Sequence, residues 1–408
     1  MIKTFTSATA TAALLAALTT TTTTTASADD LGGVEPQFGL GFHLLARGDK
    51  GKPAPDDGSD GGGGGGGGGG KGGGKPDKGG GGSGDGGGGT GGGGPGTYHA
   101  WMHPDVPQAW SLGFDGAGSF ITHIDDYNPE TSTLVSLDLN MDGVMENMYH
   151  GNAVRAFSDF ISTGATHVRQ QYDAGAMPTR NSGFEVINLS FGLMTDDGTY
   201  QDDWLLTGGH TLETEIIRLA FVDTYSAGAE SAPVIVKAAG NGGMFGTGGV
   251  IGEYVGADLP WSPFPWGFVD MVGHDLIGGD NVIFAGALDA NGTIDGNGQG
   301  TGVLAAYSDH PGANPLTQAQ TLVVGVDQSL MGTAGTSFAA PIISSYAAIV
   351  ADKFSDENLG TQPHAGLVVD RLLDTARTDT LLAYDPFYHG QGEASLSRAV
   401  APDWISGN

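Results

Sequence analysis

The stretch that decides the fold is Gly335-Thr336-Ser337-Phe338-Ala339-Ala340-Pro341, in which small residues lead into a serine. An apolar run continues to about Phe354, and its residues recur at helical spacing: Ile342, Ile343, Tyr346, Ala347, Ile349 and Val350. The stretch predicts a tight turn that opens a buried helix, with Ser337 at the first position. Pro341 is then expected in the first turn, where N–H groups have no partner within the helix.

A serine at this place lies near free backbone donors and the positive end of the helix dipole, which favour negative charge that develops nearby. Taken alone, a serine before a helix is most often only an N-cap. Three further motifs, described below, favour a chemical role for Ser337.

The composition of the 408-residue chain excludes several classes of function. There are 46 acidic and 16 basic side chains, giving a formal charge of −30. This balance argues against nucleic acid or an anionic membrane surface as a partner, because phosphate binding needs a basic patch. Cysteine is absent, which excludes disulfides, thiol catalysis and thiolate metal sites. No apolar run approaches the roughly 20 residues of a membrane span.

The N-terminal part of the sequence predicts export. In residues 1–28, Lys3 supplies the positive start, Ala12 to Leu18 a short apolar core, and Ala26-Ser27-Ala28 a small-residue cleavage site. A disordered Ala/Thr tail is the alternative. If the segment is a signal peptide, the mature protein is secreted, to an extracellular or periplasmic location.

Three segments are expected after the signal. Residues 29–48 are too few to bury a core. Residues 49–97 are dominated by glycine and predict a flexible, disordered linker that cannot offset its own chain entropy. Residues 98–408 have a globular composition and suffice for one large domain.

Short apolar runs alternate with helical patterns through this domain. Strands are expected over 120–124, 185–189, 234–238 and 282–288, and helices over 152–162, 212 to about 225, 338–354 and 364–376. Such alternation predicts an α/β fold with a doubly wound, mostly parallel sheet and helices on both of its faces. In these sheets the ligand crevice lies beyond the carboxyl ends of the strands.

Chemically capable residues follow several of these strands. Asp125 stands at the exit of the strand after Gly116-Ala117-Gly118, and Asn241 ends Ala238-Ala239-Gly240-Asn241. His150 opens the helix predicted over 152–162, and Ser190 follows a buried strand. Each has an ordinary structural explanation when taken alone, as a turn former, a cap or a surface histidine.

Together these motifs resemble the subtilisin-like serine peptidases, over about Trp110 to Ala399. The order Asp, His, Ser along the chain is that of subtilisin, and Gly-Thr-Ser-Phe-Ala-Ala-Pro is a specific match to the family's serine motif.

The sequence departs from the family's pattern in several places. His150-Gly151-Asn152-Ala153-Val154-Arg155 differs from the family's His-Gly-Thr-His-Val-Ala, with a larger side chain at Arg155. Asp126-Tyr127 replace the usual Thr-Gly, so Asp126 competes as the acid, although strand register favours Asp125. Residues 243–280 form an apparent insertion.

The resemblance implies a doubly wound subtilisin fold and an endopeptidase that cleaves protein or peptide substrates through an acyl-enzyme. Ser337 would be the nucleophile, His150 its base and Asp125 the residue that fixes the imidazole. Asn241 and the Ser337 N–H would bind the oxyanion. The substrate would add as a strand along Ser190, Phe191 and Gly192, and this edge, with Ala239 and Gly240, would form one wall of a roomy, largely apolar specificity pocket. Plain turn packing at the strand ends is the alternative for these small residues. A peptide-processing or ligating enzyme, or a binding module without activity, remain the alternatives.

A further motif points to calcium. Asp138-Leu139-Asn140-Met141-Asp142-Gly143 follows the first half of an EF-hand loop, and Glu146 stands at its ninth position. The twelfth position is Tyr149, so a complete EF-hand is not expected. The loop predicts either a set of oxygen ligands for a structural Ca²⁺, namely Asp138, Asn140, Asp142 and Glu146, or a solvated acidic turn. No organic cofactor is expected.

Overall fold

The structure, a computed structural model, describes residues 96–172, 177–191, 211–222, 232–242, 249–252, 270–355 and 363–401. The predicted signal, the short segment that follows it and all but the end of the glycine-rich linker lie outside these residues. The strands are β1 (Ser119–Asp125), β2 (Leu134–Leu137), β3 (Glu146–Tyr149), β4 (Thr166–Gln171), β5 (Phe184–Leu189), β6 (Val234–Ala238), β7 (Val282–Leu288) and β8 (Thr321–Gly325). The helices are α1 (Asp105–Ser111), α2 (His150–Ile161), α4 (Thr211–Ala220), α5 (Met271–Asp275), α6 (Pro315–Gln320), α7 (Gln328–Met331), α8 (Thr336–Phe354), α9 (Ala365–Asp374), α10 (Pro386–His389) and α11 (Leu396–Ala399).

Six strands form one sheet in the order β4-β1-β5-β6-β7-β8, and every neighbouring pair is parallel. The expected doubly wound sheet is confirmed. From β1 the chain moves outward to β4 and then returns to the other side of β1 as β5. The order therefore reverses between β1 and β5, which is where such sheets bind their ligands. Asp125 and Ser190 leave the sheet on either side of this reversal.

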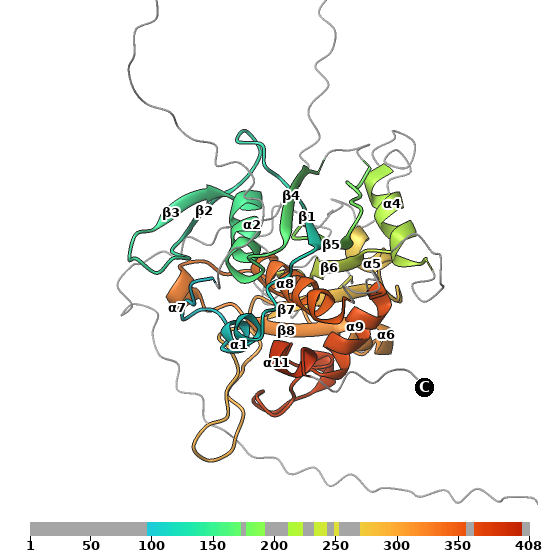
Figure 1. Ribbon diagram of the computed structural model, residues 1–408. Coiled ribbons are helices and arrows are strands. Elements are labelled where there is room, and N and C mark those ends of the chain that lie inside the picture. The colour runs from blue at the N-terminus through green and yellow to red at the C-terminus, as the bar shows by residue number, and fades with distance from the viewer. Residues whose placement is uncertain are drawn as a thin grey trace, which may run out of the picture. The chain divides into compact units, whose positions relative to one another are not determined.

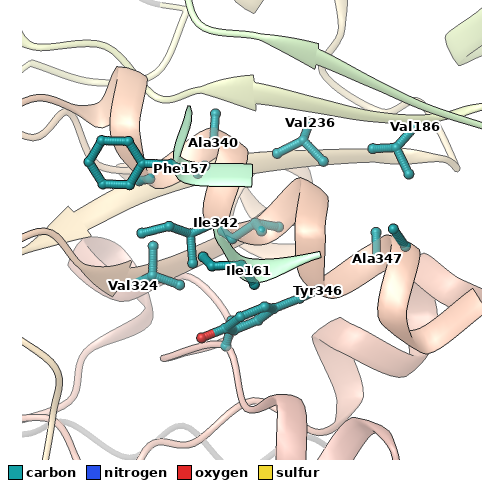
Figure 2. Close-up of a cluster of buried hydrophobic side chains, with 14 of the residues drawn as sticks. Phe157, Ile161, Val186, Val236, Val324, Ala340, Ile342, Tyr346 and Ala347 are labelled. Atoms are coloured by element: carbon teal, nitrogen blue, oxygen red, sulfur yellow. The ribbon is translucent and has the colours of Figure 1, made fainter. Parts of the chain in front are cut away.

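Helix α8 is the centre of the larger core. It is buried without a break from Thr336 to Ala351 and packs against β1, β5, β6, β7 and α2. A helix that is apolar on all sides has to lie inside the protein. Figure 2 shows Ala340, Ile342 and Tyr346 of α8 among side chains from the sheet and α2. Among the described residues, no helix is long and apolar enough to cross a membrane.

The opposite face of the sheet has its own apolar cluster. Alternate residues of the inner strands, such as Ile187, Ile235 and Phe284, pack there with residues of α4 and α5. Successive residues of the inner strands, such as Val186 and Ile187, belong to opposite clusters, as the pleat requires. Figure 1 shows α4 close to α5 on the right, and the β2–β3 hairpin beside α2 on the left.

The expected position of Pro341 is wrong. Helix α8 begins at Thr336 with Gly335 as its N-cap, so Ser337 is the second helical residue and Pro341 the sixth. Pro341 therefore lies beyond the first turn, at a position where its missing N–H removes one hydrogen bond of the helix. The group that replaces this donor is described below.

Most other elements are found where the sequence predicts them, with ends displaced by a few residues. Strands β6 and β7 have the predicted bounds, whereas α9 is shorter than predicted at both ends. Helix α4 ends at Ala220, and residues 223–225 of its predicted end lie outside the described residues. Strands β4 and β8 and the β2–β3 hairpin were not predicted. Part of the apparent insertion forms α5, whose N-cap Asp270 pairs with buried Lys237 of β6 at 2.6 Å.

Two buried histidines join β1 to β4. His123 Nε2 lies 3.3 Å from His167 Nδ1, and the rings are stacked. Burial, and next the positive charge of the neighbouring histidine, lower the pKa of His123 well below its usual value. Burial also lowers the pKa of His167, although Asp159 partly opposes this. The folded state therefore holds both rings neutral near pH 6.5, where the unfolded chain begins to protonate them.

This pair should weaken the fold in acid. Each histidine has a lower pKa in the folded state than in the unfolded chain. The free energy of unfolding is therefore unaffected at a pH above the unfolded-state pKa, and it falls as the pH drops below that pKa. The loss is up to about 1.4 kcal/mol per pH unit for each histidine. His123→Gln, which cannot titrate, should lose less stability than the unsubstituted protein between pH 7 and 5. Urea unfolding at several pH values measures this difference. Equal pH dependence of the two proteins would contradict the prediction.

Candidate active site

The Asp125 and His150 side chains are hydrogen-bonded to each other. Asp125 is the last residue of β1 and His150 the first residue of α2, and Oδ1 lies 2.8 Å from Nδ1. Both residues are almost completely buried. The Asp126 N–H also donates to Asp125 Oδ1, at 2.7 Å. The backbone N–H of His150 is held by the Thr133 carbonyl oxygen at 2.9 Å and by Ser132 Oγ at 3.1 Å.

The neighbouring carboxylate, Asp126, takes part in the turn after β1. Its Oδ1 accepts the Asn128 N–H and the Gln171 side-chain amide, each at 2.9 Å. Gln171 also accepts the Tyr127 N–H at 2.7 Å, so the last residue of β4 clamps this turn. Sequence reasoning missed Gln171 because β4 itself was not predicted. The structure thus hydrogen-bonds Asp125 to the imidazole Nδ1.

The charge of His150 depends on opposing influences. Burial disfavours the imidazolium, whereas the charge and the hydrogen bond of Asp125 favour it, and the charge of Asp126 adds to this. The net effect raises the pKa of His150 above its usual value. Arg155, the unusual residue of the histidine motif, pairs with Asp159 one turn later at 3.3 Å on the partly exposed side of α2.

Ser337 lies beside this pair, at the N-terminus of α8. Gly335 precedes it with φ 138°, a left-handed conformation that favours glycine and allows the sharp entry into the helix. The Phe338 ring packs on the His150 ring with 6.0 Å between centroids, which brings the two helix N-termini together. The Ser337 hydroxyl donates to the Ser190 carbonyl oxygen at 3.0 Å.

The Asn241 amide is oriented by the residue before the serine. Asn241 Oδ1 accepts the Thr336 N–H at 2.9 Å and the Thr336 hydroxyl at 3.0 Å. The Gly240 N–H donates to that hydroxyl at 3.1 Å. Because both Thr336 bonds go to Asn241 Oδ1, the amide hydrogens on Nδ2 are directed away from Thr336. Asn241 Nδ2 lies close to Gly335. Thr336 belongs to the serine motif, but the sequence alone gave it no role.

The predicted substrate-binding residues lie at two adjacent strand exits. Ser190 and Phe191 follow β5, and Ala239 and Gly240 follow its neighbour β6. Gly192 lies outside the described residues. The Phe191 side chain is buried and stacks on Tyr172, so only its backbone is available to a substrate strand.

One acidic side chain stands beside this region without having been predicted. The buried Asp309 carboxylate packs against Gly240, where any Cβ would overlap it. The wall expected to be largely apolar therefore has an acidic side chain next to it.

The predicted calcium ligands occupy the loop of the β2–β3 hairpin. Asp138 accepts the N–H groups of Asp142 and Gly143, and Asn140 and Asp142 bond to each other. Glu146 begins β3, and all four residues are exposed or partly exposed. Within the part of the chain that is described, no three acidic or histidine side chains gather as a metal ion would require.

Comparison with known proteins identifies the family. The subtilase family model matches residues 129–392, which include His150, Asn241 and Ser337 and begin just after Asp125. Among curated proteins, none matches this chain.

Several solved structures are similar to the chain. The prenylagaramide maturation protease PagA is 17% identical with a TM-score of 0.39, covering 73% of this chain and 98% of its own. A lanthipeptide protease is 16% identical with a TM-score of 0.41, covering 72% and 91%. The MycP3 protease of a type VII (ESX-3) secretion system is 17% identical with a TM-score of 0.42, covering 75% and 90%. Since the family model spans most of the chain and a six-stranded parallel sheet carries the matched motifs, the protein belongs to the subtilase family and is a serine peptidase.

Proposed function

We propose that the protein is an exported endopeptidase in which Ser337, His150 and Asp125 form the catalytic triad. The observation that carries the proposal is the buried 2.8 Å bond between Asp125 Oδ1 and His150 Nδ1, beside the N-terminus of α8. Nδ1 then holds its proton toward Asp125, which leaves Nε2 as the basic nitrogen. This is the tautomer that a base for serine requires.

In the proposed reaction the Ser337 hydroxyl leaves the Ser190 carbonyl and donates to His150 Nε2 as it attacks the substrate carbonyl. His150 then passes this proton to the leaving amine, which leaves an acyl-enzyme. Water, deprotonated by His150, attacks the acyl-enzyme in the same way, and the carboxylic acid product is released from Ser337. The Asn241 Nδ2 hydrogens and the Ser337 N–H stabilise the oxyanion. Thr336 holds the Asn241 amide in position before the charge appears.

The substrate is a peptide in extended form. It pairs with the backbone that follows β5, from Ser190 to Gly192, and its side chain enters between this segment and the one from Ala239 to Gly240. A peptide library analysed by mass spectrometry gives the cleavage preference. The same experiment with an added amine acceptor separates the two enzymatic alternatives, because a ligating enzyme forms a new peptide bond where a hydrolase forms a free carboxylate.

Ser337→Ala should fold normally and lose activity by several orders of magnitude, because the members of a triad act as a unit. The measurements are hydrolysis of a generic protein substrate and labelling by a fluorophosphonate, with circular dichroism as the control for folding. Activity within about tenfold of the unsubstituted protein would remove Ser337 from the proposal.

Asp125→Asn and Asp126→Asn should differ sharply. Asp125→Asn should cost several orders of magnitude in kcat, because it favours the wrong imidazole tautomer. Asp126→Asn should keep activity and move the acid limb of kcat/KM to lower pH, because it removes a charge that raises the pKa of His150. The unsubstituted protein should lose kcat/KM below a midpoint above pH 6.5. If Asp126→Asn is the inactivating change, the assignment of the acid is wrong.

We extend the proposal to a structural calcium ion in the loop from Asp138 to Glu146. The ion would have to replace some of the backbone N–H groups that now occupy the carboxylate of Asp138. Binding to the folded form alone would stabilise it by roughly 2.7 kcal/mol at a hundredfold excess over Kd.

Calcium at millimolar concentration should therefore raise the Tm relative to chelator, and Asp138→Ala/Asp142→Ala should abolish the rise. Differential scanning calorimetry measures both. A protein that does not respond to calcium has no such site, whereas an undiminished response of the double variant would place the ion elsewhere.

A further inference from the structure

The Ser337 carbonyl has lost its usual partner in the helix. In an α-helix the carbonyl of residue i accepts the N–H of residue i+4. For Ser337 that residue is Pro341, which has no N–H. A buried carbonyl without a donor is destabilising, so another group has to supply one.

The side chain of Ser190 supplies this donor. Its Oγ donates to the Ser337 carbonyl oxygen at 2.8 Å, while the Ser337 hydroxyl donates back to the Ser190 carbonyl at 3.0 Å. The two serines are therefore joined by a reciprocal pair of hydrogen bonds across the gap between β5 and α8. Ser190 is fully buried and Ser337 nearly so.

The direction of the Ser190 hydroxyl is fixed by Asn188, a residue of β5. Asn188 Nδ2 donates to Ser190 Oγ at 2.9 Å, so the Ser190 proton is directed toward the Ser337 carbonyl. Asn188 Oδ1 accepts the Ser344 hydroxyl at 3.1 Å, which sets the orientation of the amide. Asn188 and Ser344 are both fully buried. Ser344 lies seven residues after Ser337, on the same face of α8.

We propose that this buried chain, from Ser344 through Asn188 and Ser190 to the Ser337 carbonyl, positions the nucleophile, with Asn188 and Ser190 as positioning residues. The inference rests on the proposed catalytic role of Ser337. The carbonyl and N–H of Ser337 flank the Cα that carries its hydroxyl. A donor fixed on that carbonyl therefore limits how far this part of α8 can rotate.

The chain acts on the serine and leaves the base unchanged. None of its bonds reaches His150, whose Nδ1 is held by Asp125. Loss of the chain should therefore lower the rate of the chemical step without moving the pH dependence set by the imidazole. Small errors in the placement of a reacting group cost up to about 100-fold.

Ser190→Ala tests the inference. Titration with a fluorophosphonate counts the active sites, and kcat is expressed per titrated site. This normalisation is needed because a variant that is only less stable has fewer active sites, each with a normal kcat. We expect kcat per site to fall about 10- to 100-fold, with KM within about threefold and the acid midpoint of kcat/KM unchanged.

Two adjacent serines of α8 give a matched comparison. Ser344 and Ser345 are both fully buried. The Ser345 hydroxyl donates to the Pro341 carbonyl, which also receives the Ser158 hydroxyl, and so lies outside the chain. Ser344→Ala should lower kcat per site roughly three- to tenfold by releasing the Asn188 amide, whereas Ser345→Ala should leave it unchanged. This pair decides the question if Ser190→Ala does not fold.

The possible failures are distinguishable. If the unsubstituted protein is neither labelled nor active, the proposed function fails and this inference with it. If labelling depends on Ser337 but kcat per site is normal in Ser190→Ala, the proposed function stands and the positioning role is refuted. An equal loss in Ser344→Ala and Ser345→Ala would also refute it, because the effect would then follow core packing.

Discussion

The burial of α8 is the constraint on which the rest of the structure depends. Because its side chains are apolar on every side, the helix is enclosed by the sheet, α2 and α9. This fixes its N-terminus at the exits of β1, β5 and β6, where Asp125, Ser190 and Asn241 emerge. The site is thus assembled by packing of an apolar helix, and its polar groups only adjust the final geometry.

Those adjustments are made by short hydrogen bonds between buried polar groups. Asp125 receives one backbone N–H and the imidazole, and Asn241 receives both donors of Thr336. In a dry interior each such bond is worth more than at the surface, and each broken one costs more. A bond of this kind also explains why Pro341 is tolerated within α8, since the hydroxyl of Ser190, just after β5, replaces the donor that the helix lacks.

Complete burial made some strands recognisable from the sequence, although the equally buried β8 was missed. Strands β6 and β7 are apolar and buried throughout, and their bounds matched the prediction. Strand β4, at the edge of the sheet, reads Thr-His-Val-Arg-Gln-Gln and is largely polar, so it had no apolar signal. Gln171 could not be predicted for that reason. Asp309 could not be predicted either, because its approach to Gly240 depends on a contact between segments far apart in the sequence.

The parallel order of the sheet has a consequence for the timing of synthesis. The residues of the site are spread along the chain, with Asp125 near the start of the globular part and Ser337 on the helix that follows its last strand. A ribosome exposes the proposed acid and base well before the proposed nucleophile exists. The helix that carries Ser337 also has no surface to bury until β5, β6 and β7 are in place. A partly made chain is therefore harmless to its neighbours, and the capacity to cut peptides arises only with the completed fold.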